Sequence, residues 1–134
     1  MEDYKNVIGY ICDVQCNSPR AEFIREFNSW FMGEQQLDRI ISVMDDDIVW
    51  EMVGDMTIEG AAEVRALQAE ASKTMGLIEQ RVDGIVCDGS YGISFGTSIM
   101  TDGNSYAFVD IIQFKDSEDI KIEKIKTFMS KLES

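Results

Sequence analysis

The sequence predicts an α+β domain in which helices from the N-terminal half cover a mostly antiparallel sheet. Apolar residues recur at helical spacing in the first 76 residues, and two Asp-Gly pairs mark tight hairpins in the second half. A third observation is the segment 105–114, which is apolar on both faces and therefore belongs in the middle of a covered sheet. At 134 residues and 45% apolar content, residues 1–134 can form one domain with a single core.

Two helices are expected near the N-terminus. The first covers residues 3–14, so that residues 1–17 form a helical extension of the domain. Its apolar face is formed by Tyr4, Val7, Ile8 and Ile11. The second helix starts at Ser18-Pro19, where the hydroxyl caps the helix and proline fits its first turn, and it ends at Gly33.

The middle of the chain predicts a short helix, a strand and a longer helix. The short helix has an apolar stripe formed by Leu37, Ile40, Ile41 and Met44. We expect residues 45–47, three consecutive aspartates, to form a solvated turn, because adjacent residues cannot converge on one metal ion. A strand over 48–53 follows, and a helix lies between Gly60 and Gly76 with Val64, Leu67, Ala71 and Met75 facing inward.

The Asp-Gly pairs set an expected strand register. If 102–103 is a two-residue loop, Phe95 lies opposite Asp110 on a large aromatic face. The loop at 88–89 would add Val82, Gly84 and Val86 to this face. The opposite face would be small and flat, and a second copy of the sheet could cover it. In the last strand, 120–129, a phase change at 123–124 predicts a bulge that bends the sheet.

Charge and composition exclude several classes of function. A net charge of −13 repels phosphate backbones and anionic lipid, so we expect neither nucleic acid nor membrane as a partner. The absence of histidine removes the commonest general base and metal ligand. The three cysteines lack metal-site spacing, so we expect reduced thiols and no metal or other cofactor. The start of the sequence lacks the pattern of a secretion signal, and a cytoplasmic protein is expected.

Asp110 is the residue that most strongly suggests a function. A lone carboxylate among Phe108, Val109 and Ile111 is costly to bury. It must therefore accept hydrogen bonds, become neutral, or line a cavity that uses an acid. Two interpretations remain open: a protonated acid that donates to a ligand oxygen, or a structural aspartate held by neighbouring tyrosines or backbone amides.

The order and spacing of several motifs are similar to those of a known family. The motifs are Phe27-x2-Trp30, Leu37-x2-Ile40-Ile41, Asp46-Asp47-Ile48-Val49-Trp50, Ile58-x-Gly60, Phe108-Val109-Asp110-Ile111-Ile112-Gln113-Phe114 and Ile122-x2-Ile125-x2-Phe128. Over roughly residues 18–130 the chain resembles the nuclear transport factor 2-like superfamily, and most of all its SnoaL-like and ketosteroid isomerase-like members. The resemblance implies a conical sheet wrapped around helices, with a pocket at the wide end.

The isomerase resemblance implies particular site residues. Asp110 would be the buried acid that donates to a substrate's developing oxyanion. Glu51 would take the place of the general base, and Asn28 that of the second oxyanion donor. Either Glu51 or Trp50 can face the pocket, and the alignment selects Glu51. The substrate-binding residues would be Phe27, Phe31, Val49, Phe95, Tyr106, Phe108 and Ile112.

Two hypotheses of function follow. The first is a cytosolic homodimer, paired through the outer face of its sheet, that transfers a proton next to a carbonyl in a hydrophobic small molecule, as an isomerase or a polyketide cyclase does. The second is a non-catalytic module of the same fold that binds a ligand or a protein. The acids discriminate between them: if Glu51 and Asp110 do not reach one cavity, the binding module is favoured.

Overall fold

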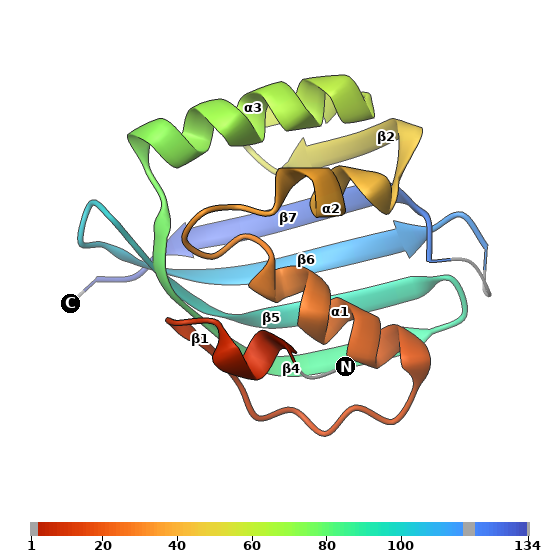
Figure 1. Ribbon diagram of the computed structural model, residues 1–134, viewed down its shortest axis with the longest axis horizontal. Coiled ribbons are helices and arrows are strands. Elements are labelled where there is room, and N and C mark those ends of the chain that lie inside the picture. The colour runs from red at the N-terminus through yellow and green to blue at the C-terminus, as the bar shows by residue number, and fades with distance from the viewer. Residues whose placement is uncertain (1–2, 117–119, 134) are drawn as a thin grey trace.

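The computed structural model describes residues 3–116 and 120–133 as one curved, unclosed sheet with helices (Figure 1). A 3₁₀ helix η1 (Asp3–Asn6) precedes the helices α1 (Pro19–Ser29), α2 (Leu37–Ser42) and α3 (Ala61–Thr74). The strands are β1 (Tyr10–Cys12), β2 (Met44–Met52), β3 (Met56–Glu59), β4 (Leu77–Asp88), β5 (Tyr91–Met100), β6 (Ser105–Phe114) and β7 (Ile122–Lys131). Their order in the sheet is β1-β4-β5-β6-β7-β2-β3.

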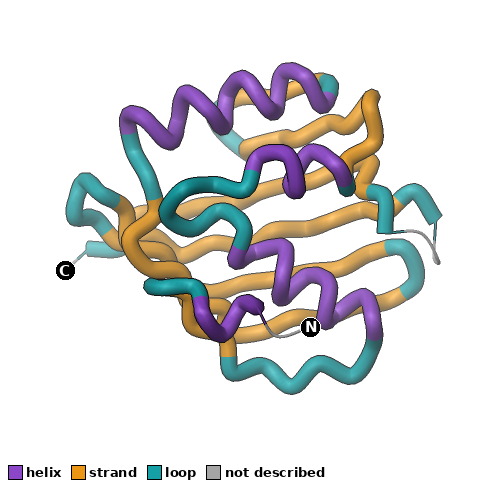
Figure 2. The backbone as a smooth tube through the Cα atoms, in the orientation of Figure 1, coloured by secondary structure: helices purple, strands orange, loops and turns teal. Residues whose placement is uncertain are grey.

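The helices lie on one side of the sheet, which curves around them (Figure 2). The pairs β1–β4 and β2–β7 are parallel, and every other neighbouring pair is antiparallel. The predicted α+β class, with a mixed and mostly antiparallel sheet wrapped around helices, is confirmed. None of the helices in the described ranges is long and apolar enough to cross a membrane.

The main core fills the space between the helices and the β6–β7–β2 half of the sheet. Its fully buried side chains come from α1, α2, α3 and these strands, and include Ile24, Ile40, Ile48, Val64, Ile112, Phe114, Ile122 and Ile125. Ser18 caps α1 as predicted, since its hydroxyl accepts from the Ala21 N–H at 3.1 Å. A cavity adjoins this core, and Phe27, Trp50, Ile112 and Ile125 belong to both.

The predicted helix over residues 3–14 is wrong. After η1, Gly9 adopts a φ of +86°, which breaks the helical path, and β1 then pairs with β4. Tyr4 and Tyr10 are buried, whereas Ile8 is 94% exposed. The apparent helical stripe therefore includes one residue that points into solvent.

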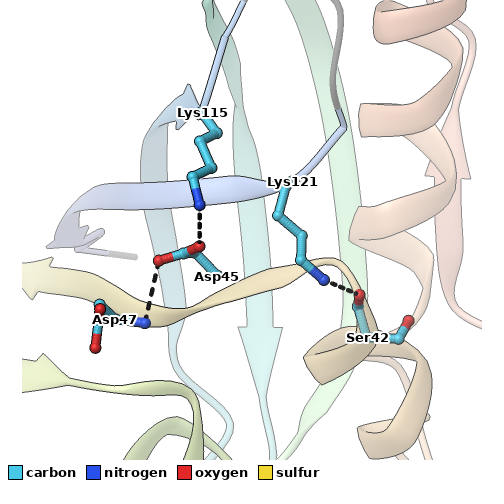
Figure 3. Close-up of polar contacts among 5 residues, drawn as sticks. All are labelled: Ser42, Asp45, Asp47, Lys115 and Lys121. Atoms are coloured by element: carbon cyan, nitrogen blue, oxygen red, sulfur yellow. Dashed lines mark hydrogen bonds and ion pairs between the residues drawn. The ribbon is translucent and has the colours of Figure 1, made fainter.

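The predicted turn at the three aspartates is also wrong, because they lie within β2. Asp45 accepts a hydrogen bond from Lys115 Nζ at 2.9 Å and another from the Asp47 N–H at 3.2 Å (Figure 3). These donors hold the pKa of Asp45 below its usual range. Nearby, Lys121 Nζ donates to the Ser42 carbonyl at 3.0 Å. The acidic run lies in a strand that pairs with β3 and β7, and Lys115 balances the charge of Asp45 there.

The register between β5 and β6 differs from the prediction by one residue. Phe95 pairs with Val109, and Ser94 pairs with Asp110. The loop is longer than two residues: the Met100 N–H donates to the Asn104 carbonyl at 3.0 Å, and Gly103 has a φ of +86°. A shift of one residue reverses the faces of a strand, so Phe95 points to the outside of the sheet.

A bulge in β4 has a similar effect on the other hairpin. Val82 pairs with Gly96 and Gly84 with Phe95, which leaves Asp83 as the extra residue. Val82 is therefore buried as predicted, whereas Gly84 and Val86 lie on the outer face. The outer face carries large apolar side chains and is not the small, flat surface that was expected.

The predicted bulge near the start of the last strand is confirmed. Gln113 pairs with Lys124 and Phe114 with Ile122, so Glu123 is the additional residue. Gln113 Nε2 donates to Glu123 Oε2 at 2.6 Å and ties the bulge to β6. Residues 117–119, in the connection before it, lie outside the described residues.

Candidate functional site

A cavity of about 520 Å³ lies between α1, α3 and the inner face of the sheet. Its wall is mostly aromatic and aliphatic, and it is built from residues of α1, β2, α3, β4, β5, β6 and β7. The 53–55 turn and Met75 at the end of α3 also line it, and these residues are exposed. A largely apolar cavity with a few polar groups is the usual form of a small-molecule site.

Six of the ten residues expected in the site line this cavity. They are Asp110, Asn28, Phe27, Phe31, Phe108 and Ile112. Phe27, in α1, packs edge to face at 5.3 Å against Phe31, which follows the helix, and Phe31 packs in the same way against Trp50 at 6.0 Å. These rings form one wall of the cavity.

The other four residues lie elsewhere. Val49 and Glu51 point away from Trp50, which faces the cavity, and Glu51 lies 3.7 Å from Lys126 Nζ. Phe95 lies on the outer face, and the hydroxyl of Tyr106 donates to Asp102 at 3.1 Å. The structure therefore does not bring Glu51 and Asp110 into one cavity.

Asp110 is held by a relay of two hydrogen bonds. Trp50 Nε1 donates to Thr127 Oγ1 at 2.9 Å, and Thr127 Oγ1 donates to Asp110 Oδ1 at 2.6 Å. An indole N–H can only donate, so the single hydroxyl hydrogen of Thr127 is directed to the carboxylate. Among the described residues no other hydrogen bond reaches the carboxylate of Asp110, and its second oxygen is available to a ligand.

Burial raises the pKa of Asp110 from 3.8 to about 6, while the Thr127 hydroxyl acts in the opposite direction. The residue is half-buried, and it lines the cavity rather than the outer surface. At pH 7 roughly nine in ten molecules carry the ionised form. Asp110 is therefore mainly a proton acceptor near neutral pH, which differs from the protonated donor implied by the isomerase resemblance.

A second polar network crosses the cavity wall from α1 to β4 and β5. Asn28 Nδ2 donates to the Ile24 carbonyl at 3.0 Å and to Ser94 Oγ at 3.3 Å. Gln80 Nε2 donates to Asn28 Oδ1 at 2.9 Å, and Ser98 Oγ donates to Gln80 Oε1 at 3.3 Å. All four of these polar side chains are buried.

The cavity has a negative electrostatic character. Its described lining includes Asp55 and Asp110 but no lysine or arginine. In the described ranges, no group of three or more acidic or thiol side chains is placed to hold a metal ion. An anionic ligand would meet unfavourable charge here, whereas a neutral apolar ligand would not.

Gln80, Ser98 and Thr127 were not among the predicted site residues, and of the two alternatives for β2 the alignment selected Glu51, whereas Trp50 lines the cavity. A signal for Gln80 was present, since it lies between the outward-facing Glu79 and Arg81. Trp50 also alternates with Val49 and Glu51 in phase with Ile48, which is fully buried. No comparable signal marks Thr127, because its role depends on the pairing of β7 with β6.

The curved sheet, its helical cover and the cavity at one end place the chain among the nuclear transport factor 2-like proteins. It belongs to the SnoaL-like domain family, whose pattern matches residues 22–123. No curated protein matches the sequence.

Several solved structures share this fold. An epoxide hydrolase of the limonene epoxide hydrolase-like type from Mycobacterium tuberculosis superposes with a TM-score of 0.71 at 18% identity, covering 83% of this chain and 78% of that one. A provisionally assigned SnoaL-like polyketide cyclase from Shewanella denitrificans gives 0.67 at 10% identity, covering 84% and 92%. A provisionally assigned isomerase of the SnoaL-like family from Agrobacterium tumefaciens gives 0.62 at 12% identity, covering 84% and 99%. At these identities the similarity establishes the fold alone.

The Thr127 hydroxyl is expected to set the protonation of Asp110. In Thr127→Val the carboxylate loses its donor, so the pKa of Asp110 should rise above about 6. Thr127→Ser keeps the hydroxyl, so the pKa of Asp110 in this variant should stay close to its value in the parent protein. The measurement is a pH titration of the Asp110 carboxyl carbon by NMR. An unchanged pKa in the valine variant would show that the relay does not act on the carboxylate.

Asp110 should also make the fold less stable at neutral pH. The pKa of Asp110 is higher in the folded protein than the ordinary 3.8, so ionising this carboxyl lowers the free energy of unfolding. This loss of stability is absent below pH 4, grows as the pH rises to about 6, and stays constant above it. The nearly isosteric Asp110→Asn should gain up to about 3 kcal/mol of unfolding free energy at pH 7. Urea denaturation of both proteins at pH 4 and pH 7 measures this gain. Equal gains at the two pH values would contradict the assignment.

Proposed function

We propose that this protein binds a hydrophobic, uncharged, carbonyl-containing molecule in the cavity and that Asp110 removes a proton next to the carbonyl. The observation that carries the proposal is the carboxylate of Asp110 on the inner wall of a largely apolar cavity, with one oxygen held by Thr127 and a pKa of about 6; Asp55, the other acid of the lining, is exposed at the 53–55 turn. A general base is most effective when its pKa lies near the working pH. Isomerisation or cyclisation of a ketone requires such a step.

The proposed mechanism uses one carboxylate rather than two. Glu51 lies outside the cavity beside Lys126, so it does not enter the mechanism. Asp110 in its ionised form accepts the proton and can return it to another position of the same substrate. The apolar wall limits the access of water to the enolate that forms.

A second candidate is the non-catalytic binding module. The position of Glu51 favours it, because the two acids do not share one cavity. The same neutral, hydrophobic ligand would then be bound without proton transfer. Measuring proton exchange separates the two candidates.

The catalytic proposal is tested with 2-tetralone in D₂O, in which the loss of the proton signals next to the carbonyl is followed by NMR. The protein should accelerate exchange, and the rate should rise with pH and level off above about 6 as Asp110 ionises. Asp110→Asn should lower the catalysed rate by about 10²-fold or more.

Asp83→Asn is the matched control, since it makes the same change at an exposed position in the β4 bulge. Glu51→Gln should leave the rate intact, and a loss in this variant would restore the two-carboxylate mechanism. Exchange that is equally fast with the parent protein and with Asp110→Asn would leave the binding module as the remaining candidate.

We also propose that two copies pair through the outer face of the sheet. Phe95, Val109 and Phe128 lie in one row across β5, β6 and β7, and each is at least 36% exposed. Tyr91 and Val86 extend this apolar surface. A row of apolar side chains on neighbouring strands can meet the same row of a second copy about a twofold axis.

Val109→Lys places a charge at the centre of this row and should convert a dimer to a monomer. Size-exclusion chromatography with light scattering measures the mass of each species. Ile8→Lys, at an exposed position away from the outer face, is the control and should keep the mass of the parent protein. A monomeric parent protein at high micromolar concentration would exclude the dimer.

A further inference from the structure

The hydrogen-bond network of Asn28 has a direction that the structure fixes. The Ile24 carbonyl can only accept, so Asn28 must present its amide nitrogen to it. Asn28 Oδ1 then faces Gln80, which must present its own nitrogen at 2.9 Å. Gln80 Oε1 consequently faces Ser98, whose hydroxyl must donate at 3.3 Å. One backbone carbonyl thus determines the orientation of both amides.

Counting hydrogens along this network shows which donor remains. The two hydrogens of Asn28 Nδ2 go to the Ile24 carbonyl and to Ser94 Oγ. The hydroxyl hydrogen of Ser98 goes to Gln80. Gln80 Nε2 has two hydrogens, and the network uses one of them. Gln80 therefore keeps one donor hydrogen on a side chain that lines the cavity.

The other polar groups of the cavity do not offer a fixed donor. The Trp50 N–H and the Thr127 hydroxyl are committed to the Asp110 relay. Gln35 and Gln68 also line the cavity, but no hydrogen bond within the described residues orients either amide, and Gln35 Oε1 is buried without a partner. Asn28, which the sequence resemblance placed as an oxyanion donor, has no hydrogen left to give.

We propose that Gln80 is the residue that binds the ligand's carbonyl oxygen, in place of Asn28. This inference rests on the proposed function and adds the group that recognises the oxygen. Asn28 and Ser98 act as positioning residues that hold the Gln80 amide with its nitrogen available. Gln80 and Asp110 both line the cavity, and the network that starts at Gln80 ends at Ser94, which pairs with Asp110 on the neighbouring strand. The ligand class is a hydrophobic ketone or a related molecule with a neutral oxygen acceptor.

The test compares 2-acetylnaphthalene with 2-isopropenylnaphthalene, a hydrocarbon of similar shape. At pH 8, where Asp110 is ionised and cannot donate, the protein should bind the ketone about fivefold or more tightly than the hydrocarbon, after correction for their different solubilities in water. With ¹³C in the carbonyl, the infrared stretch of the bound ketone should lie below its value in hexane. A stretch at the hexane value in the parent protein would overturn the proposal without any variant.

Gln80→Leu should lose the ketone preference and the infrared shift. Gln35→Leu, at the unanchored amide, should keep both, whereas Ser98→Ala, which removes the donor that holds Gln80 Oε1, should reduce both. A merely structural role of Gln80 would weaken the binding of both probes equally and leave their ratio unchanged. An infrared shift that persists in Gln80→Leu would overturn the proposal.

A second measurement on the parent protein covers the case in which Gln80→Leu does not fold. In ¹⁵N-glutamine-labelled protein, the Gln80 side-chain amide hydrogens should show a nuclear Overhauser contact to the acetyl methyl of the bound ketone, and the absence of this contact would contradict the proposal. Asp110→Asn separates this inference from the proposed function. It should abolish 2-tetralone exchange and keep the ketone preference, so either proposal can fail while the other stands.

Discussion

The cost of keeping an ionisable carboxylate in an apolar cavity constrains the rest of this structure. Asp110 lies on a strand whose inward neighbours are Phe108 and Ile112, and burial raises its pKa. A strand in this position would be more stable with an apolar residue there. The fold reduces the cost with one short hydrogen bond from Thr127 and leaves the second carboxylate oxygen open to the cavity. A carboxylate oxygen that is open to a cavity serves a protein that transfers a proton to or from a ligand. Packing of the core does not require it.

The three main helices and the face of β6 could be predicted from the sequence because they depend on local patterns. Apolar spacing located α1, α2 and α3, but not η1 and β1, and the parity of residues 105–114 placed Asp110 on the same face as Phe108 and Ile112. The phase change near Glu123 located a bulge for the same reason. Such signals come from side chains within one element, so a sequence contains them in full.

The registers could not be predicted, because each depends on the length of a loop or on a bulge that leaves the hydrophobic pattern nearly unchanged. The loop before Ser105 is one residue longer than predicted, and Phe95 therefore lies on the outer face. In β4 the extra residue Asp83 reverses the alternation of inward and outward side chains between Val82 and Gly84. The polar residues of the site follow these registers. Gln80 keeps the phase of Val82, before the bulge, and its inward position could have been inferred from the alternation, whereas the outward turn of Gly84 and Val86 could not.

The two polar networks together explain why one carboxylate can be sufficient here. On one side, Trp50 donates to Thr127 and Thr127 donates to Asp110, which favours the ionised form of Asp110 and prepares it to accept a proton. On the other side, Asn28 and Ser98 hold Gln80 so that a donor hydrogen faces the ligand. Abstraction of a proton next to a carbonyl moves negative charge from the base to the oxygen. A neutral amide donor can stabilise that oxygen without competing for the proton, whereas a lysine or an arginine at the same place would lower the pKa of Asp110 and weaken it as a base. The absence of cations from the described cavity wall is therefore consistent with a base that must keep its raised pKa.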